Sequence, residues 1–116
     1  MLKEASKQFA DTLTKKAVLQ PLYKNRNIVV EIKDNEEQTW LCFKNGTCEV
    51  SDVKPEVVDI SVYGPSQFVE SLMNGSERLM LLESEGNLNI DGNLHHLLAL
   101  ESLFLLTGQQ SSLVKH

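Results

Sequence analysis

Two carboxylates and two imidazoles lie close together between Asp91 and Glu101, in a part of the chain that is otherwise rich in leucine. These residues are Asp91, His95, His96 and Glu101. Side chains of these types can bind a divalent metal ion or transfer protons during a reaction. One hypothesis is therefore a metal- or carboxylate-dependent enzyme built around Asp91, His95 and Glu101.

The spacing of the two histidines argues against a metal site. Neighbouring residues of an α-helix point about 100° apart, so His95 and His96 are poorly placed to bind the same ion. Helices that bind zinc place their histidines four positions apart, but the residues four positions after His95 and His96 are Ala99 and Leu100. We therefore expect one histidine to face solvent and the other to flank the hydrophobic core, and we predict no metal or cofactor.

Signatures of a catalytic nucleophile are also missing from the sequence. It contains no Gly-x-Ser-x-Gly motif, no Cys-x-x-Cys motif and no glycine-rich loop of the kind that binds phosphate. Glu101 has leucines three and four positions away. It lies either at the solvent edge of an apolar stripe, which is the commoner situation, or inside the stripe, where it would meet a ligand hydroxyl group. We predict a protein that is not an enzyme and has no catalytic residues.

The apolar periodicity changes along the chain from helical to extended and then back to helical. Ser76 is expected to cap a helix, and Asp91 or Asn93 to cap the last one. Gly108 ends that last helix, and the residues from about 108 form a loose tail. The expected elements are helices at 2–16 and around 18–23, a strand at 27–34, a hairpin at 38–52, a strand at 56–64, helices at 66–73 and 77–84, a strand at 87–90 and a helix at 94–106.

These elements predict one α+β domain spanning residues 1–116. The four strands between 27 and 64 follow one another without a helix, so we expect them to pair as consecutive antiparallel strands. A fifth strand completes a five-stranded, mostly antiparallel sheet. The helices should pack on one face of this sheet, because their apolar stripes and the apolar strand positions need a common core.

The two cysteines lie in the predicted hairpin. The Asn45-Gly46 pair favours a two-residue turn, which places Cys42 opposite Glu49 rather than opposite Cys48. The cysteines then point to opposite faces of the sheet and form no disulfide. Free cysteines suit a reducing compartment, and the N-terminal sequence lacks the apolar segment of a secretory signal. We therefore expect a cytoplasmic protein.

The composition of the chain argues against several classes of partner. The 116 residues carry a net charge of −5, which argues against nucleic acid because phosphate binding needs an excess of Lys and Arg. The same charge argues against docking on anionic lipid through charge alone. No apolar run approaches the roughly 20 residues that a membrane-spanning helix requires, so we expect no transmembrane segment.

Apolar residues in the second half of the chain exceed what one face of a five-stranded sheet can cover. Leucine, methionine, isoleucine, valine and phenylalanine occupy much of the segment 68–106. This surplus can be buried around an internal cavity that holds an apolar ligand, which flexible Leu and Met side chains are suited to line. It can equally be buried in a homodimer interface.

Three segments of the chain together resemble the sterol carrier protein type-2 (SCP2) family. The segments are WLCFKNGTCEV, VDISVYGPSQFVESLMNGS and GNLNIDGNLHHLLALESLF, and their order and spacing carry the resemblance. The last segment follows the family pattern G-x-L-x-I-x-G-(D/N) with Gly86, Leu88, Ile90, Gly92 and Asn93. The resemblance covers about residues 9–106.

The resemblance implies an SCP2-like fold, in which helices cover one face of a five-stranded sheet and enclose a hydrophobic tunnel. It also implies non-catalytic binding or carriage of a lipid-type ligand, such as a fatty acid, an acyl-CoA or a sterol. The alternative is an interaction module without a ligand, whose surplus apolar surface forms a homodimer. On the first reading, nine residues become the candidate apolar lining: Phe68, Leu72, Met73, Leu79, Met80, Leu82, Leu94, Leu98 and Leu105.

Overall fold

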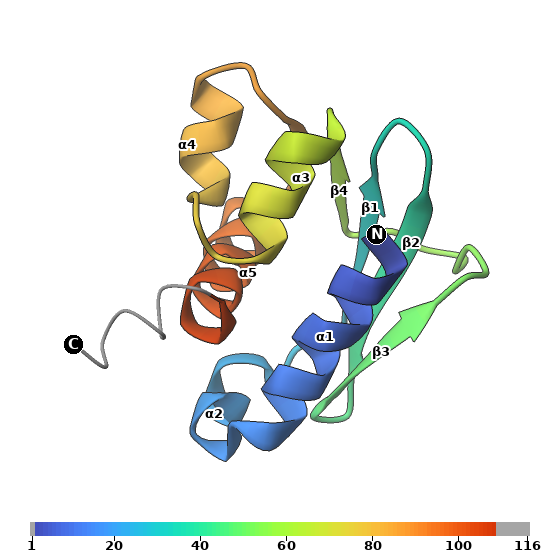
Figure 1. Ribbon diagram of the computed structural model, residues 1–116. Helices are drawn as coiled ribbons and strands as arrows, with labels where there is room; N and C mark the ends of the chain where they lie inside the picture. Colours follow the sequence, from blue (N-terminus) through green and yellow to red (C-terminus); the bar gives the residue numbers. More distant parts are fainter. Residues whose placement is uncertain (1, 109–116) are drawn as a thin grey trace.

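The helices and strands follow one another in the order that the periodicity predicts. The structure, a computed structural model, describes residues 2–108. Of the tail expected from about residue 108, only Gly108 lies within this range. The elements, drawn in Figure 1, are α1 (Leu2–Lys15), the 3₁₀ helix η1 (Ala17–Leu19), α2 (Gln20–Tyr23), β1 (Ile28–Lys33), β2 (Gln38–Lys44), β3 (Thr47–Ser51), β4 (Ile60–Tyr63), α3 (Ser66–Met73), α4 (Leu79–Ser84), β5 (Asn89–Gly92) and α5 (Leu94–Thr107).

The five strands form one mixed sheet in the order β3-β2-β1-β4-β5. Three neighbouring pairs are antiparallel, whereas β1 and β4 are parallel. The sheet is therefore mostly antiparallel, as predicted, but the expected run of four consecutive antiparallel strands is wrong. The connection formed by residues 52–59 carries the chain from the β3 edge back past β2 and β1, so β4 pairs with β1 instead of β3 (Figure 1).

Asp59 fixes the start of β4 beside β1. Its backbone N–H donates to the carbonyl oxygen of Val29 at 2.8 Å, and its Oδ2 accepts from the backbone N–H of Val29, also at 2.8 Å. β4 is shorter than the predicted strand at 56–64, because the residues before Asp59 belong to the crossing connection.

One face of the sheet carries the hydrophobic core. Alternate strand residues such as Val30, Leu41 and Val62 point to this face and are buried. The helices contribute Phe9 and Phe104, whose ring centroids lie 4.7 Å apart. Residues of α1, α3, α4 and α5 join the strand residues in a single cluster, so the helices cover one face of the sheet, as predicted. No helix within residues 2–108 combines the length and apolar character needed to cross a membrane.

The β2–β3 hairpin has the register that its turn residues predict. Asn45 and Gly46 both adopt a positive φ, of 53° and 78°, as a two-residue hairpin turn of this kind requires. Cys42 therefore lies opposite Glu49. Cys48 faces the core, where burial raises the pKa of its thiol to about 12. Both cysteines are free and point to opposite faces, as predicted.

The observed cap of α5 decides between two expected residues, and the observed cap of α4 differs from the expected one. Asn93, and not Asp91, caps α5, because its Oδ1 accepts from the backbone N–H of His95 at 2.8 Å. The prediction that Ser76 caps α4 is wrong. That helix begins later, with Arg78 at the N-cap position and no side-chain hydrogen bond from it.

Gly108 ends α5 where the chain touches the turn after α3. A Cβ atom at this position would collide with the backbone carbonyl of Asn74. The absence of a side chain therefore allows the end of α5 to pack directly on the α3–α4 turn.

Candidate functional site

The structure separates the side chains that define the enzyme hypothesis. Asp91 lies opposite Ser61 on the outer face of the sheet and is exposed. His95 is exposed in the first turn of α5. Glu101 is directed to the start of α4. Across residues 2–108, no three His, Cys, Asp or Glu side chains are placed to hold a metal ion together.

Glu101 stabilises a neighbouring helix. Its Oε2 accepts a hydrogen bond from the backbone N–H of Met80 at 3.0 Å. Met80 lies in the first turn of α4, where backbone N–H groups have no partner within the helix. The carboxylate also suits the positive end of the helix dipole. Glu101 is half-buried at the edge of the apolar stripe of α5, one of the two positions considered from sequence, and it acts as a cap for another helix.

The interior between the sheet and α5 is almost filled by side chains. The remaining space measures about 10 Å³, which is enough for one water molecule at most. This space is therefore too small to hold a lipid chain. Apolar residues of β1, β2, β4 and α5 line this interior space together with three polar residues, Tyr23, Arg26 and His96.

His96 leaves one ring nitrogen without a partner beside the interior space. Its Nδ1 atom is buried and makes no hydrogen bond, a situation that costs about 1–3 kcal/mol. In contrast, Tyr23 donates its hydroxyl hydrogen to the carbonyl oxygen of Leu13 at 3.4 Å. Arg26 donates from Nε to the carbonyl oxygen of Leu22 at 3.1 Å. The expectation that one histidine faces solvent and the other flanks the core is confirmed.

An open cleft between α2 and α5 adjoins the interior space. Its volume is about 630 Å³, within the range of roughly 300–1,000 Å³ that is typical of small-molecule sites. Arg26 and Ala99 line both the cleft and the interior space, so the two meet at these side chains. We call it the α2–α5 cleft, and its other lining residues are Pro21, Leu22, Asn25, His95, Leu98 and Ser102.

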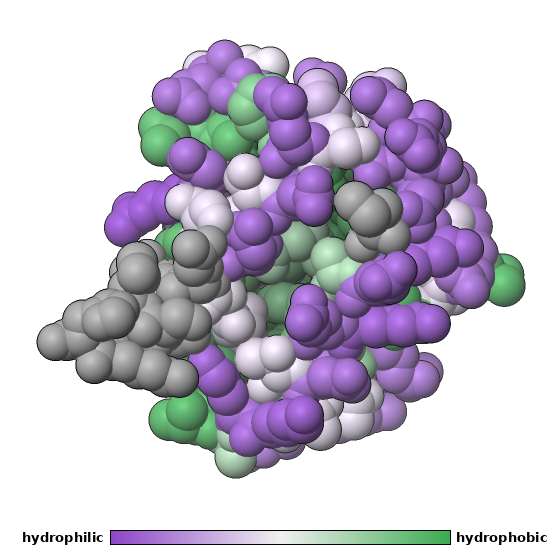
Figure 2. All heavy atoms as spheres, viewed as in Figure 1, coloured by the Kyte–Doolittle hydropathy of each residue, from purple (hydrophilic) through white to green (hydrophobic). Residues whose placement is uncertain are grey.

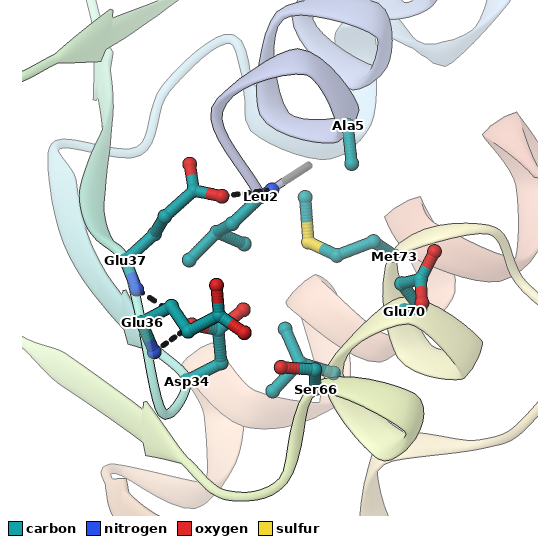
Figure 3. A pocket seen from close by; sticks show the side chains of 9 residues that line it. Leu2, Ala5, Asp34, Glu36, Glu37, Ser66, Glu70 and Met73 are labelled. Carbon is teal, nitrogen blue, oxygen red and sulfur yellow. Dashed lines mark hydrogen bonds between the residues drawn. The ribbon is translucent and has the colours of Figure 1, made fainter.

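A second hollow, the α1–α3 groove, lies between α1 and α3. Its two adjoining parts measure about 100 and 440 Å³ and share residues of both helices, including Met73. Figure 2 shows weakly apolar atoms on its floor and hydrophilic atoms around it. Figure 3 shows Asp34, Glu36 and Glu37 on one side of the smaller part and Glu70 on the other. Four carboxylates around this part of the groove disfavour an anionic lipid.

Two of these carboxylates already accept hydrogen bonds from backbone N–H groups of the protein. Asp34 Oδ1 accepts from the backbone N–H groups of Glu36 and Glu37 at 2.8 and 2.7 Å. Glu37 in turn accepts from the backbone N–H groups of Leu2 and Lys3 at 3.1 and 3.4 Å. The bond from Leu2 is the main cause that lowers the pKa of Glu37. These contacts attach the start of α1 to the β1–β2 turn, so the α2–α5 cleft is the better candidate for a ligand site.

The nine residues predicted to line a tunnel lie in different environments. Leu72, Met73, Leu79 and Leu82 are buried in the core, Phe68, Met80 and Leu105 are partly buried, and Leu94 and Leu98 are exposed. Leu98 lines the α2–α5 cleft, whereas Met73 lines the α1–α3 groove. The structure does not gather the nine around one cavity, and their role in ligand binding stays a prediction.

Sequence reasoning missed the segment that precedes β1. Pro21, Leu22, Asn25 and Arg26 form one wall of the α2–α5 cleft. The helix α2 has only four residues, and Asn25 and Arg26 follow it in a turn and loop, so this segment gives no useful periodicity. One signal was present in the sequence, because residues 12–30 contain four basic residues and no acidic one.

Comparisons with known proteins agree with the observed fold. The SCP-2 sterol transfer family matches residues 2–105. Among solved structures, a UbiJ-SCP2 ubiquinone synthesis protein superimposes with a TM-score of 0.72 at 15% identity, over 88% of this chain and 86% of that one. The sterol carrier protein domain 2 of Helicoverpa armigera gives a TM-score of 0.70 at 16% identity, over 90% of this chain and 85% of that one. A crystal structure of sterol carrier protein 2 gives a TM-score of 0.65 at 10% identity, over 91% of this chain and 95% of that one. No curated protein matches the sequence significantly.

Proposed function

Because the chain belongs to the SCP-2 sterol transfer family, we propose that it binds and carries one molecule of a lipid-type ligand without catalysing a reaction on it. The proposed entrance is the α2–α5 cleft, and the proposed seat of the apolar part is the layer between α5 and the sheet. The observation that carries the proposal is that the cleft and the interior space meet at Arg26 and Ala99. Movement of these two side chains would give a ligand in the cleft access to the apolar face of β1 and β4.

Binding requires the layer under α5 to open, because an interior space of about 10 Å³ is too small for a lipid. α5 suits such a movement because it is apolar on several sides. Leu97, Leu100 and Leu103 face the core, while Leu94 and Leu98 face solvent. A lipid chain inserted under α5 replaces hydrophobic and dispersion contacts with contacts of the same kind. The backbone hydrogen bonds within the helix stay intact during this exchange.

The polar end of the ligand is best accommodated near Arg26 and His96. Because Nδ1 of His96 is buried without a partner, a ligand group that hydrogen-bonds to it offsets part of the cost of that burial. The guanidinium of Arg26 has further N–H donors besides the Nε–H that binds Leu22. This arrangement favours an amphiphile, with its polar end in the cleft and its apolar part on the sheet, over a pure hydrocarbon.

Among the nine predicted lining residues, Leu98 is proposed as the first to contact a ligand, because it lines the entrance. Leu72, Leu79 and Leu82 are buried in the core between the sheet and α3 and α4. They contact a ligand only if its apolar part extends beneath those helices. A shorter ligand would leave them in their present packing.

We also propose a cytoplasmic location. The supporting observation is that Cys42 and Cys48 are free and point to opposite faces of the sheet. Reducing compartments keep thiols in this state, whereas small secreted domains more often pair them in disulfides.

A substitution at Ala99 tests the proposed entrance. Ala99→Phe places a ring where the cleft and the interior space meet. We expect it to lower affinity for a fluorescent long-chain fatty acid or a fluorescent sterol, whichever the wild type binds, by about tenfold or more, equivalent to about 1.4 kcal/mol. Leu106→Phe is the matched control, because Leu106 is exposed on the same helix but does not line the cleft. Circular dichroism checks that both variants fold.

Native mass spectrometry of freshly purified protein, followed by organic extraction, tests the function itself. A mass excess that extracts as a lipid supports carriage and begins to identify the ligand. A protein that retains no lipid and binds neither probe contradicts the proposed function. Equal binding by the wild type and Ala99→Phe contradicts only the proposed entrance.

A further inference from the structure

The smaller part of the α1–α3 groove combines an apolar floor with an acidic rim. Leu2 of α1 and Val69 and Met73 of α3 line the floor. Figure 3 shows the Met73 side chain between Glu36 on one side and Glu70 on the other. Among the described residues that line either part of the groove, none is Lys, Arg or His. The lining therefore attracts a positively charged group and also offers it apolar contacts.

Two of the four carboxylates have unused hydrogen-bonding capacity. Asp34 and Glu37 already accept from backbone N–H groups. Glu36 and Glu70 are exposed, and their side chains hydrogen-bond to no described residue. Glu36 belongs to the β1–β2 turn and Glu70 to α3, so the two approach the groove from different elements. A cation that enters this part of the groove meets a carboxylate on either side.

The size of this part suits one long side chain. It measures about 100 Å³, several times the roughly 10–15 Å³ that one water molecule needs on the same measure. Lysine and arginine side chains place their aliphatic stem along apolar surface and keep the charged end in a polar environment. In the groove, the stem would contact Leu2 and Met73, and the charged end would lie near Glu36 and Glu70.

The larger part of the groove provides a polar continuation. It measures about 440 Å³, and Gln8, Thr12 and Asn74 are among its lining residues. Gln8 and Asn74 are exposed, and their side-chain amides can both donate to and accept from a peptide backbone. Between Leu2 and Thr12 the helix rises about 15 Å, the length of about four or five residues of extended chain. The groove thus has room for a short peptide segment beside the position of one basic side chain.

We infer that the α1–α3 groove binds an extended segment of a partner protein, anchored by one lysine or arginine side chain in the smaller part. The groove shares no lining residue with the α2–α5 cleft. Binding of the segment therefore does not depend on the proposed function, and the protein can hold a lipid and a partner at the same time.

The chemistry of the groove argues against other occupants. An anionic lipid or a nucleic acid would bring negative charge toward four carboxylates. A metal ion needs several ligands at once, and no three His, Cys, Asp or Glu side chains within residues 2–108 are placed to hold one. An apolar floor of Leu2, Val69 and Met73 also offers no metal ligand that hard cations prefer. A basic peptide matches both the charge and the floor.

Selection from a library of random dodecapeptides displayed on phage tests the inference with the full chain. We expect the enriched peptides to carry lysine or arginine next to apolar residues. A synthetic, fluorescein-labelled copy should bind in a fluorescence polarisation assay, and more weakly as salt is added. The double variant Glu36→Gln with Glu70→Gln should lower the affinity about tenfold, because an exposed ion pair contributes up to about fivefold.

A change in the peptide identifies the anchoring contact. Norleucine in place of the peptide's lysine keeps the four-carbon stem and removes the charge. It should lower affinity for the wild type about tenfold and leave affinity for the double variant nearly unchanged, since the two changes remove the same interaction. Glu56→Gln with Glu77→Gln is the matched control: both residues are exposed and lie outside the groove, so it should bind as the wild type does. Circular dichroism checks that all variants fold.

Several results would overturn the inference. They are enrichment of no peptide or of acidic peptides, equal binding by the wild type and the double variant, and equal loss in the control. So would a wild-type dimer that the double variant dissociates, since the groove would then bind a second copy. A peptide that binds only after residues 109–116 are removed would also overturn it, because the groove would then be occupied by the chain itself.

Uptake of the fluorescent fatty acid separates this inference from the proposed function. A wild type that takes up the fatty acid but enriches no basic peptide keeps the function and loses the partner site. A wild type that binds the peptide but takes up no lipid does the reverse.

Discussion

The hydrogen bond between Met80 and Glu101 predicts a measurable loss of stability when the carboxylate is removed. α4 has six residues, and its N-cap residue Arg78 makes no side-chain cap bond. Glu101 instead accepts from Met80 at 3.0 Å. Loss of an N-cap costs about 0.5–2 kcal/mol, and a hydrogen bond to a charged group contributes about 1.5–3 kcal/mol. Because Glu101 is only half-buried, we expect Glu101→Ala to cost about 1–2 kcal/mol.

Thermal unfolding followed by circular dichroism measures this loss. For a domain of this size, about 1–2 kcal/mol corresponds to a decrease in Tm of about 4–8 °C. Glu101→Gln keeps an acceptor oxygen but no charge, so it should lose about half as much, since charge-assisted bonds are about twice as strong. Glu70→Ala on α3 is the control: Glu70 is exposed and its side chain hydrogen-bonds to no described residue. Its effect should stay within about 0.5 kcal/mol.

Amide hydrogen exchange locates the effect. We expect faster exchange in the first turn of α4 in Glu101→Ala, above all at Met80. Unchanged Tm together with unchanged exchange at Met80 would refute the capping role. Reduced lipid uptake at unchanged stability would instead support a ligand-facing Glu101, one of the two positions considered from sequence.

Two further substitutions test the core and the start of α1. Phe104→Ala should lower the free energy of unfolding in urea by about 3–5 kcal/mol, because the ring is fully buried and packs on Phe9 at 4.7 Å; a loss below about 1 kcal/mol would contradict this packing. Glu37→Gln should destabilise the protein at neutral pH and less so in acid. The hydrogen bond from Leu2 lowers the pKa of Glu37, so the stabilisation is present above its ordinary value of 4.5 and is lost as pH falls through the folded-state pKa. A difference from wild type in urea unfolding that does not change with pH would count against this contact.

Local sequence signals predicted the parts of the fold that depend on local backbone geometry. The Asn45-Gly46 turn fixes the hairpin, so the position of Cys42 opposite Glu49 followed from the sequence and is confirmed. Asn93 was one of two expected caps of α5, and its side chain makes the cap bond. In each case a few neighbouring residues determine the outcome.

The parallel pairing of β1 with β4 could not be predicted in the same way. It depends on the connection at 52–59, which has no periodic pattern, and on Asp59, which hydrogen-bonds to Val29. Strands that follow one another in sequence usually pair, and that tendency favoured the wrong neighbour for β4. A contact between residues so far apart in the sequence leaves no signal in the local spacing of apolar residues.

The spacing of apolar residues also could not predict which face of α5 points to the core. The helix is apolar on several sides, so spacing of three or four residues selects Leu94 and Leu98 as readily as Leu97 and Leu100. Packing on the sheet decides between them, and it buries Leu97 and Leu100 while Leu94 and Leu98 remain exposed.

The parallel β1–β4 pair also joins two antiparallel units of the sheet, one formed by β1, β2 and β3 and the other by β4 and β5. β1, β2 and β3 form from consecutive residues, and β4 pairs with β5 across α3 and α4, whereas β1 and β4 meet only after the chain has crossed between them. α2 precedes the first unit along the chain and α5 follows the second, so the α2–α5 cleft lies between helices that adjoin different units. Opening the cleft separates helices that belong to different units and leaves the strand pairing within each unit undisturbed.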